Sequence, residues 1–237
     1  METLVLRLLI ITSAGALSEK HVFIDKQETW PDARQHCREE YTDLSPITNE
    51  VEEGVLKQFA GEDKSGWIGL YWDKDVKKWK WSGGDNVTNQ NWLNGIPDIA
   101  TNAKWTSDGW RAVSGLNKIH FFCLNLIVVQ EKKTWEEALV HCTEHHSSLT
   151  SLLSKSETLL AQNRIRNATV TEEIWIGLRY LGDSWLWVNG DPLVYSSWPE
   201  GGDQDHLCPI WRRCGALTKE GVWENIGCHE KLHFICA

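Results

Sequence analysis

Residues 29–37 read TWPDARQHC, and residues 134–142 read TWEEALVHC. Both stretches place an Ala three residues after the Trp and a Cys four residues after that Ala. A short run of strand-type residues precedes each of them, at residues 21–24 and 126–129. The pattern predicts that each copy opens with a strand, followed by a helix that carries Trp, Ala and Cys on neighbouring turns.

The repetition continues to the end of the chain. WIGL occurs at residues 67–70 and 175–178, WKW and WLW stand at 79–81 and 185–187, and HFFC and HFIC close the copies at 120–123 and 233–236. Chance does not align so many Trp and Cys positions. We therefore expect two tandem domains of one type, residues 17–124 and 125–237, a size that suits single domains.

The amino terminus predicts the compartment. Residues 4–17 form an apolar run interrupted by Arg7, Thr12 and Ser13, and small residues occupy positions 14–16. This is typical of a signal peptide, residues 1–16, although a buried helix of the mature fold is the alternative. No stretch reaches the roughly 20 apolar residues of a membrane span. We expect a secreted, extracellular protein.

Composition narrows the function. Fifteen Trp and seven Cys in 237 residues indicate small cores closed by aromatic packing and disulfides. The net charge of -9 argues against binding to nucleic acid or to anionic membranes. No nucleophile with its base, and no paired carboxylate motif, is recognisable, so we do not expect an enzyme.

Seven cysteines permit many pairings, which the repeat narrows. Since Cys37 is equivalent to Cys142 and Cys123 to Cys236, the simplest pattern is Cys37–Cys123 and Cys142–Cys236. Each bridge would tie the first helix of a copy to its last strand.

The second copy has an additional pair, Cys214 and Cys228, whose counterparts in the first copy are Asn102 and Gly115. Their joint absence there predicts a Cys214–Cys228 disulfide, because losing one partner alone would leave a reactive thiol. Cys208 remains unpaired. It is expected to form an intermolecular disulfide, to be an exposed thiol, or to be buried and inert.

Each copy resembles a C-type lectin-like domain, with its opening strand, WxxAxxxC helix, WIGL motif and closing FxC strand. The resemblance covers nearly all of residues 19–237, and the tandem arrangement is similar to the repeats of macrophage mannose receptor-like proteins, particularly the fish type. It implies an α+β fold, in which two helices flank small antiparallel sheets and a long loop carries the binding site.

In sugar-binding members of that family, a Glu-Pro-Asn or Gln-Pro-Asp loop and a Trp-Asn-Asp strand hold Ca²⁺, which takes about six to eight oxygen ligands. In the first domain, Ile96 stands where the loop should offer Glu or Gln, and Arg111-Ala112 follow Trp110. The resemblance therefore implies that this calcium site is lost, since a guanidinium repels the cation at short range.

The second domain keeps oxygen-bearing side chains in altered order, WPEGGDQD at residues 198–205 and WEN at 223–225. Asp203, Asp205, Glu224 and Asn225 would form a weak calcium site, the only cofactor that we expect; the alternative is a solvated acidic loop. Trp211 and Arg212 lie on the stretch that corresponds to the family's binding loop. They complete the predicted ligand-binding set, with a structural role for Trp211 as the alternative.

Three further observations concern single residues. Most tryptophans recur at equivalent positions and are expected in the cores, whereas Trp105 and Trp211 stand apart. Asn86 and Asn167 open glycosylation sequons, so both are expected at the surface. The spacing of His141 and His145 would suit zinc, but Cys142 between them is expected in a disulfide, and the histidines on an exposed helix face.

The leading expectation is a secreted C-type lectin-like protein that binds glycans or glycoproteins through its second domain. The alternative is a calcium-independent protein interaction module, including a homodimer linked through Cys208. The departure from the family's calcium motifs is the feature that separates the two.

Overall fold

The computed structural model describes residues 20–87, 91–93, 95, 101–200 and 204–237; the predicted signal peptide lies outside them. By their contacts, the described residues divide into two compact units. The first unit is Lys20–Asn125 together with Ser154–Leu160, and the second is Leu126–Leu153 together with Ala161–Ala237.

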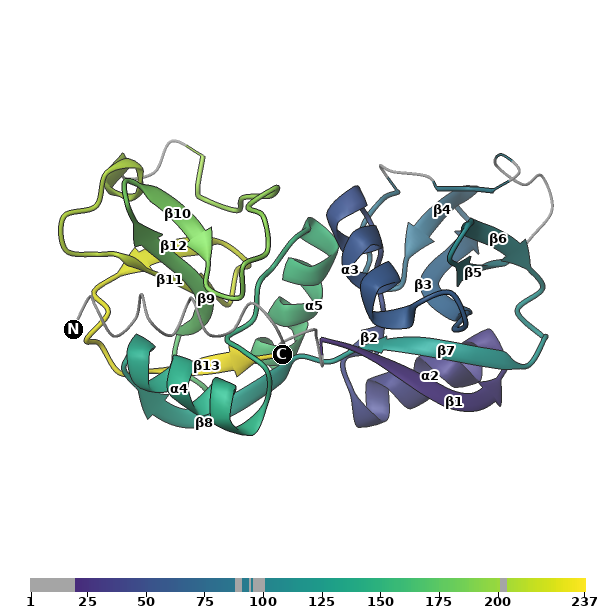
Figure 1. Cartoon of the computed structure of the whole chain (residues 1–237), viewed down its shortest axis with the longest axis horizontal. Helices are drawn as coiled ribbons and strands as arrows, with labels where there is room; N and C mark the ends of the chain where they lie inside the picture. Colours follow the sequence, from purple (N-terminus) through teal and green to yellow (C-terminus); the bar gives the residue numbers. More distant parts are fainter. Residues whose placement is uncertain (1–19, 88–90, 94, 96–100, 201–203) are drawn as a thin grey trace. The chain divides into compact units, whose positions relative to one another are not determined.

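The first unit combines helices with one seven-stranded sheet (Figure 1). Its elements are β1 (His21–Glu28), α2 (Trp30–Glu40), β2 (Asp43–Leu44), α3 (Glu50–Ala60), β3 (Gly66–Asp73), β4 (Lys78–Trp81), β5 (Asn102–Thr106), β6 (Gly109–Val113) and β7 (Ile119–Leu124). The strand order is β1-β7-β3-β5-β6, with β2 paired to β7 and β4 to β3. Only β3 and β7 run parallel among these described pairs.

The second unit repeats this plan. Its elements are β8 (Ile127–Lys133), α4 (Trp135–His145), α5 (Lys155–Arg166, the part to Leu160 grouping with the first unit), β9 (Glu173–Leu181), β10 (Ser184–Trp187), a 3-10 helix (Gln204–Leu207), β11 (Cys214–Thr218), β12 (Trp223–Ile226) and β13 (Leu232–Cys236). The strand order is β12-β11-β9-β13-β8, with β10 on β9. The predicted α+β fold in two tandem copies is confirmed.

The first helix of each copy begins at the Thr-Trp pair. Thr29 caps α2 by accepting a hydrogen bond from the Asp32 backbone N–H. Thr134 caps α4 in the same way, and there the Glu137 side chain also accepts from the Thr134 N–H, which completes a capping box. Such caps satisfy backbone donors that the first turn leaves unpaired, so the Thr that recurs in both copies fixes where each helix starts.

The repeated tryptophans hold helix and sheet together. The Trp30 indole donates to the carbonyl of Ile68 at 2.9 Å, and Trp135 donates to Ile176 at 3.0 Å. In return, the Trp of each WIGL motif donates to the carbonyl just before the helix cap: Trp67 to Glu28 and Trp175 to Lys133. All four rings are buried, so each indole is anchored by packing and by a paired N–H.

The glycine of each WIGL motif is required by a close approach of two backbone segments. A Cβ at Gly69 would stand 2.9 Å from the Leu44 carbonyl oxygen, and one at Gly177 would stand 2.7 Å from that of Leu149. The backbone N–H of Gly69 donates to the carbonyl of Ser45, and that of Gly177 donates to the carbonyl of Thr150. A larger residue would push these segments apart.

Disulfides join the elements that the repeat predicts. Cys37 of α2 bonds to Cys123 of β7, Cys142 of α4 bonds to Cys236 of β13, and Cys214 of β11 bonds to Cys228. The first two connect the opening helix of each copy to its closing strand. All four of their cysteines are buried in hydrophobic clusters beside the anchoring tryptophans.

Candidate functional site

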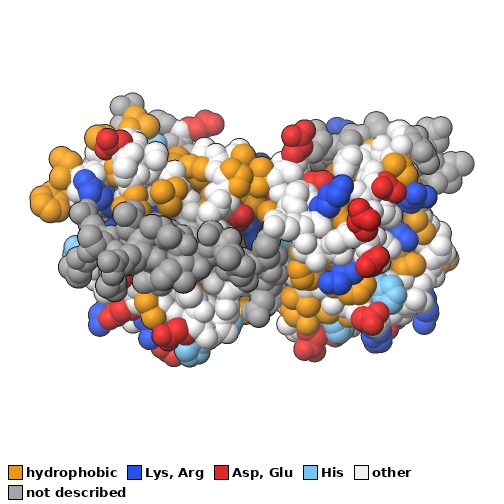
Figure 2. Space-filling model, in the orientation of Figure 1, with side chains coloured by type: hydrophobic (Ala, Val, Ile, Leu, Met, Phe, Trp, Pro, Cys, Tyr) orange, Lys and Arg blue, Asp and Glu red, His pale blue; other side chains and the backbone are white. Residues whose placement is uncertain are grey.

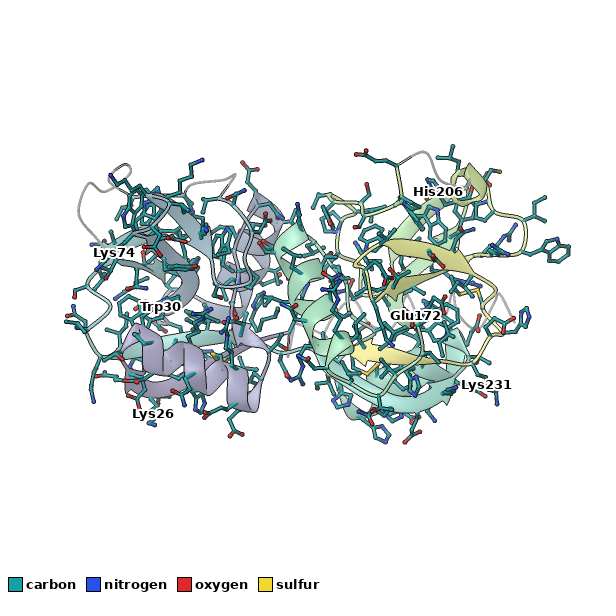
Figure 3. The ribbon with its side chains drawn as sticks, turned by 180° about the vertical axis from the view of Figure 1, so that it is seen from behind. Lys26, Trp30, Lys74, Glu172, His206 and Lys231 are labelled. Atoms are coloured by element: carbon teal, nitrogen blue, oxygen red, sulfur yellow. A yellow bond between two sulfur atoms is a disulfide. The ribbon has the colours of Figure 1, made fainter. Side chains whose placement is uncertain are left out.

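The chain between β10 and β11 of the second unit forms the loop that corresponds to the predicted binding region. Aromatic contacts fix its base: the rings of Trp198 and His206 stack with centroids 4.7 Å apart, and Trp185 lies 5.0 Å from Trp198. The Trp185 indole also donates to the His206 carbonyl at 2.6 Å. These contacts of His206, which is labelled in Figure 3, therefore hold the 3-10 helix against Trp185 of β10.

Beyond this base, the loop exposes apolar side chains. Leu207 is 64% exposed, Ile210 68% and Trp211 85%. We call these three residues the loop patch; hydrophobic side chains are visible at the outer edge of this unit in Figure 2. A cluster of large exposed hydrophobic residues at one place on a soluble domain marks an interaction site more often than scattered single ones do.

Backbone contacts hold the segment that follows Trp211. The Asn225 side-chain amide on β12 donates to the Arg212 carbonyl at 3.2 Å. The Arg213 carbonyl accepts from the Tyr180 N–H at 2.9 Å, and the Arg213 guanidinium donates to the Pro209 carbonyl at 3.2 Å. The structure thus brings two predicted site residues, Arg212 and Asn225, into direct contact.

Glu224, the neighbouring residue on β12, lies in an acidic environment. Desolvation raises the pKa of its carboxyl, and the charges of Glu173 and Glu220 raise it further, whereas Arg212 lowers it. Like charges at short range disfavour ionisation of each carboxylate.

The rest of the predicted calcium set cannot be placed. Asp203 and the side chain of Asp205 lie outside the described part of the chain, as do Ile96, Pro97 and Asp98 of the first domain. Arg111, predicted to oppose calcium in the first domain, is exposed on β6 next to the buried Trp110. The calcium site of the second domain therefore stays a prediction.

Cys208 is exposed and forms no disulfide in the structure, in contrast to the buried alternative. Its thiol is hydrogen-bonded to the Tyr180 hydroxyl. Desolvation raises the pKa of Tyr180, and the Cys208 thiol raises that pKa further. The thiol thus lies at the surface, next to Leu207 in the sequence and two residues before Ile210.

Our reading of the sequence missed Leu207 and Ile210. The signal was present, since two aliphatic residues stand within four positions of Trp211, directly after the polar and acidic stretch at residues 200–206. The two sequon asparagines, Asn86 and Asn167, are exposed, as glycosylation requires, although Thr88 lies outside the described residues.

Comparison with known proteins shows the family. The model of the Lectin C-type domain matches residues 26–124 and again residues 131–237. The chain belongs to the C-type lectin domain family. The model matches each copy once. Each matched stretch includes the tryptophans that join helix and sheet and the two cysteines of the helix-to-strand disulfide.

Three human proteins are similar to most of this chain. Human lymphocyte antigen 75 is 23% identical over 88% of this chain, human secretory phospholipase A2 receptor 23% over 88%, and human C-type mannose receptor 2 20% over 92%. The chain spans only 14%, 17% and 18% of their lengths, respectively. The second and third of these relatives are named as receptors.

Solved structures of single domains also align with the chain. Human lithostathine is 24% identical with a TM-score of 0.41, covering 47% of this chain and 80% of that one. The cow C-type carbohydrate-recognition domain of CD23 is 26% identical with a TM-score of 0.41, covering 47% and 84%.

Among the described residues, no helix has both the length and the apolar character of a membrane span.

Proposed function

We propose that this chain is a secreted, extracellular binding protein whose second domain recognises carbohydrate or glycoprotein ligands through the loop patch. The observation that carries the proposal is Trp211, whose side chain is 85% exposed, whereas every repeated tryptophan is buried or half-buried. Membership of the C-type lectin domain family supports a binding role, and the predicted signal peptide, residues 1–16, supports secretion.

The chemistry of the patch suits a sugar. An indole face offers a large, rigid apolar surface on which the C–H face of a pyranose ring packs, and little conformational freedom is lost. Arg212, next in the chain, offers several N–H donors for hydroxyl or acidic groups. Asn225 and Tyr180 hold the backbone of the two residues that follow Trp211. Little conformational entropy is therefore lost when this part of the loop binds a ligand.

We also propose that Asp203, Asp205, Glu224 and Asn225 provide a weak calcium site beside this patch. Ca²⁺ bound there would accept sugar hydroxyls into its oxygen shell. The acidic surroundings of Glu224 support cation binding. Calorimetric titration of Ca²⁺ into the folded chain tests this: neither heat nor a rise in melting temperature at millimolar metal would remove the calcium-dependent version.

A glycan array with and without chelator tests the function. The probe is the full chain carrying Cys208→Ser, so that disulfide-linked dimers do not add avidity. We expect Trp211→Ala to lower binding about tenfold or more, as truncation of an exposed aromatic anchor does, without changing the melting temperature. Leu116→Ala, which alters an exposed apolar residue of the first unit, is the matched control. Equal glycan binding by the Trp211 and Leu116 variants would contradict the proposal.

The second candidate is calcium-independent protein binding, including a homodimer linked through Cys208. The exposed thiol within the apolar loop patch favours it. Light scattering and non-reducing electrophoresis of the wild type against Cys208→Ser distinguish the two. A covalent dimer that disappears in the variant, together with silence on the glycan array, would favour the protein-interaction function.

A further inference from the structure

A pair of histidines lies on α4, away from the loop patch. His141 and His145 are one helical turn apart, and their rings are nearly parallel, with 15° between the planes and 4.6 Å between the centroids. They border a surface hollow that is lined by residues of α4 and β8. These two elements lie side by side in Figure 1. Its other charged lining residues are Glu131, Lys133, Glu136, Glu137 and Glu144.

We propose that His141 and His145 chelate a divalent transition-metal ion, such as Zn²⁺, at the mouth of this hollow. Imidazole nitrogen is a ligand that such ions prefer, whereas Ca²⁺ prefers oxygen. The site therefore differs in chemistry and in place from the calcium site proposed for the loop. Water would complete the coordination, with the carboxylates around it compensating the charge.

The backbone geometry brings the two donors together. Residues four apart on a helix lie above one another on one face, so both rings can turn toward a single ion. His141 is half-buried, and its ring packs edge-on against Phe234 at 5.1 Å. His145 is exposed and adjusts to the fixed ring. One preordered ligand with one adaptable ligand lowers the entropy lost on binding.

Cys142 cannot take part, because it is bonded to Cys236. This excludes a structural zinc centre of the Cys-His type, as the sequence predicts, but it leaves the two-histidine pair intact. The disulfide also ties α4 to β13, so the helix that carries both ligands is held to the sheet. Metal binding here would stabilise an already folded element.

The charge around the pair favours a cation. Four carboxylates, those of Glu131, Glu136, Glu137 and Glu144, line the hollow, against the single ammonium of Lys133. Lys133 is itself paired with Glu131 at 2.9 Å. His145 is the last residue of α4, where the partial negative charge of the helix end adds to the attraction.

The proton state of the pair also suits a metal. Burial lowers the pKa of His141, and the nearby His145, Lys133 and His146 lower it further, while Glu131 acts in the opposite direction. The imidazole is therefore neutral near pH 7, with a lone pair available for a metal ion.

Two other groups of potential ligands must be separated from this site. Glu136 lies close to the sulfurs of Cys214 and Cys228, but a disulfide removes both thiolates from coordination. Cys208 has a free thiol two residues after His206, and a thiol competes for Zn²⁺. The experiment therefore uses the untagged full chain with Cys208→Ser.

Isothermal titration with ZnCl₂ near neutral pH should show one site per chain. We expect His145→Gln to weaken it about tenfold or more, as loss of one of two protein ligands does, and His141→Gln to do the same. Glu131→Gln should weaken it less. His145 is exposed, so its variant should keep the melting temperature of the metal-free chain.

The chain supplies its own controls. In the first copy, His36 and Glu40 occupy the positions of His141 and His145, so the pair is absent there, and His36→Gln should leave Zn²⁺ affinity unchanged. His146→Gln, with its ring 6.2 Å from that of His141, should also change little.

Solution conditions provide two more checks. Zn²⁺ affinity should fall as the pH is lowered below neutral, because protons compete with the metal ion for the imidazole nitrogens. Millimolar Ca²⁺ should not compete. Unchanged affinity in His145→Gln, or the absence of any Zn²⁺ heat in the Cys208→Ser chain, would overturn the proposal without touching glycan binding by the loop patch.

Discussion

At the scale of single residues, His21 shows how burial changes the chemistry of a side chain. It lies at the start of β1, fully enclosed, with its Nδ1 3.0 Å from the Ser45 hydroxyl. Burial lowers its pKa to about 3, and the charge of Lys20 contributes in the same direction. In the unfolded chain, the same imidazole has a pKa of about 6.5.

This difference predicts a loss of stability in acid. Between pH 6.5 and pH 3, the unfolded chain binds a proton at His21 that the folded chain does not, so the free energy of unfolding falls as the pH falls. The loss from this residue amounts to about 2 kcal/mol at about pH 5. Burial raises the pKa of Glu52 to about 7, which acts in the opposite direction over part of this range.

A variant isolates the contribution of His21. In His21→Gln the titrating group is gone while Glu52 remains, so the difference in unfolding free energy between wild type and variant should shrink by about 2 kcal/mol from pH 7 to about pH 5. Urea denaturation at a series of pH values measures it. A constant difference across that range would show that His21 is not held neutral by the fold.

Tryptophan positions show what the sequence could predict at this scale and what it could not. Most of the repeated tryptophans are buried in the cores, as their equivalence indicates, whereas Trp92, Trp185 and Trp198 are half-buried. Trp105, set apart because it lacks an equivalent, is also fully buried. Its indole donates to Glu53 of α3, a carboxylate that also accepts from Trp110 at 3.0 Å. The sequence alone does not show that Glu53, which lies far from both tryptophans along the chain, provides this acceptor.

At the scale of elements, the two copies differ where the third disulfide is present or absent. Gly115 and Cys228 are structurally equivalent, since the carbonyl of each accepts from the first Trp of the helix, Trp30 or Trp135. Asn102 pairs with Tyr71 on β3 as Cys214 pairs with Arg179 on β9. In the first copy, the Asn102 side chain fills the space that a Cβ at Gly115 would need.

This equivalence predicts that a third disulfide can be built into the first copy. Asn102→Cys with Gly115→Cys removes the obstructing amide and places two thiols where the second copy has its bridge. Closing a loop of this size stabilises by up to about 3 kcal/mol. Under non-reducing conditions, the melting temperature of the first copy should rise above that of the wild type. If mass spectrometry finds three free thiols in the double variant instead of Cys208 alone, the equivalence is wrong.

Local sequence predicted the opening strand and helix of each copy, because caps, tryptophans and cysteines are short-range signals. It could not predict the conformation between β10 and β11. That segment lacks a repeating apolar pattern and is held by side-chain contacts such as Trp198 with His206, which only the folded chain brings together.

At the scale of the whole molecule, each copy has one disulfide that joins residues far apart in the sequence and encloses most of that copy. Cys37–Cys123 and Cys142–Cys236 span sequence separations of 86 and 94 residues. In the chain-entropy model, loops of this length stabilise by about 4.5 kcal/mol each. That is a large share of the stability of a domain of about 100 residues.

Removal of one of these two disulfides should therefore destabilise only the copy that contains it. We expect Cys37→Ala with Cys123→Ala to lower the stability of the first copy by about 4 kcal/mol. Hydrogen exchange with mass spectrometry localises the effect: peptides from residues 20–125 should lose protection, whereas peptides from residues 167–237 should keep it. Equal loss in both regions would contradict the division into two modules.

The reciprocal bonds between the tryptophans and backbone carbonyls have an evolutionary consequence. The acceptor before one helix belongs to Glu28 and its counterpart to Lys133, an acid and a base, yet both receive the same indole hydrogen. A main-chain oxygen is present whatever side chain is encoded. Mutation can therefore reverse the surface charge at such positions without removing the acceptor, and duplicated copies can acquire different ligands on an unchanged frame.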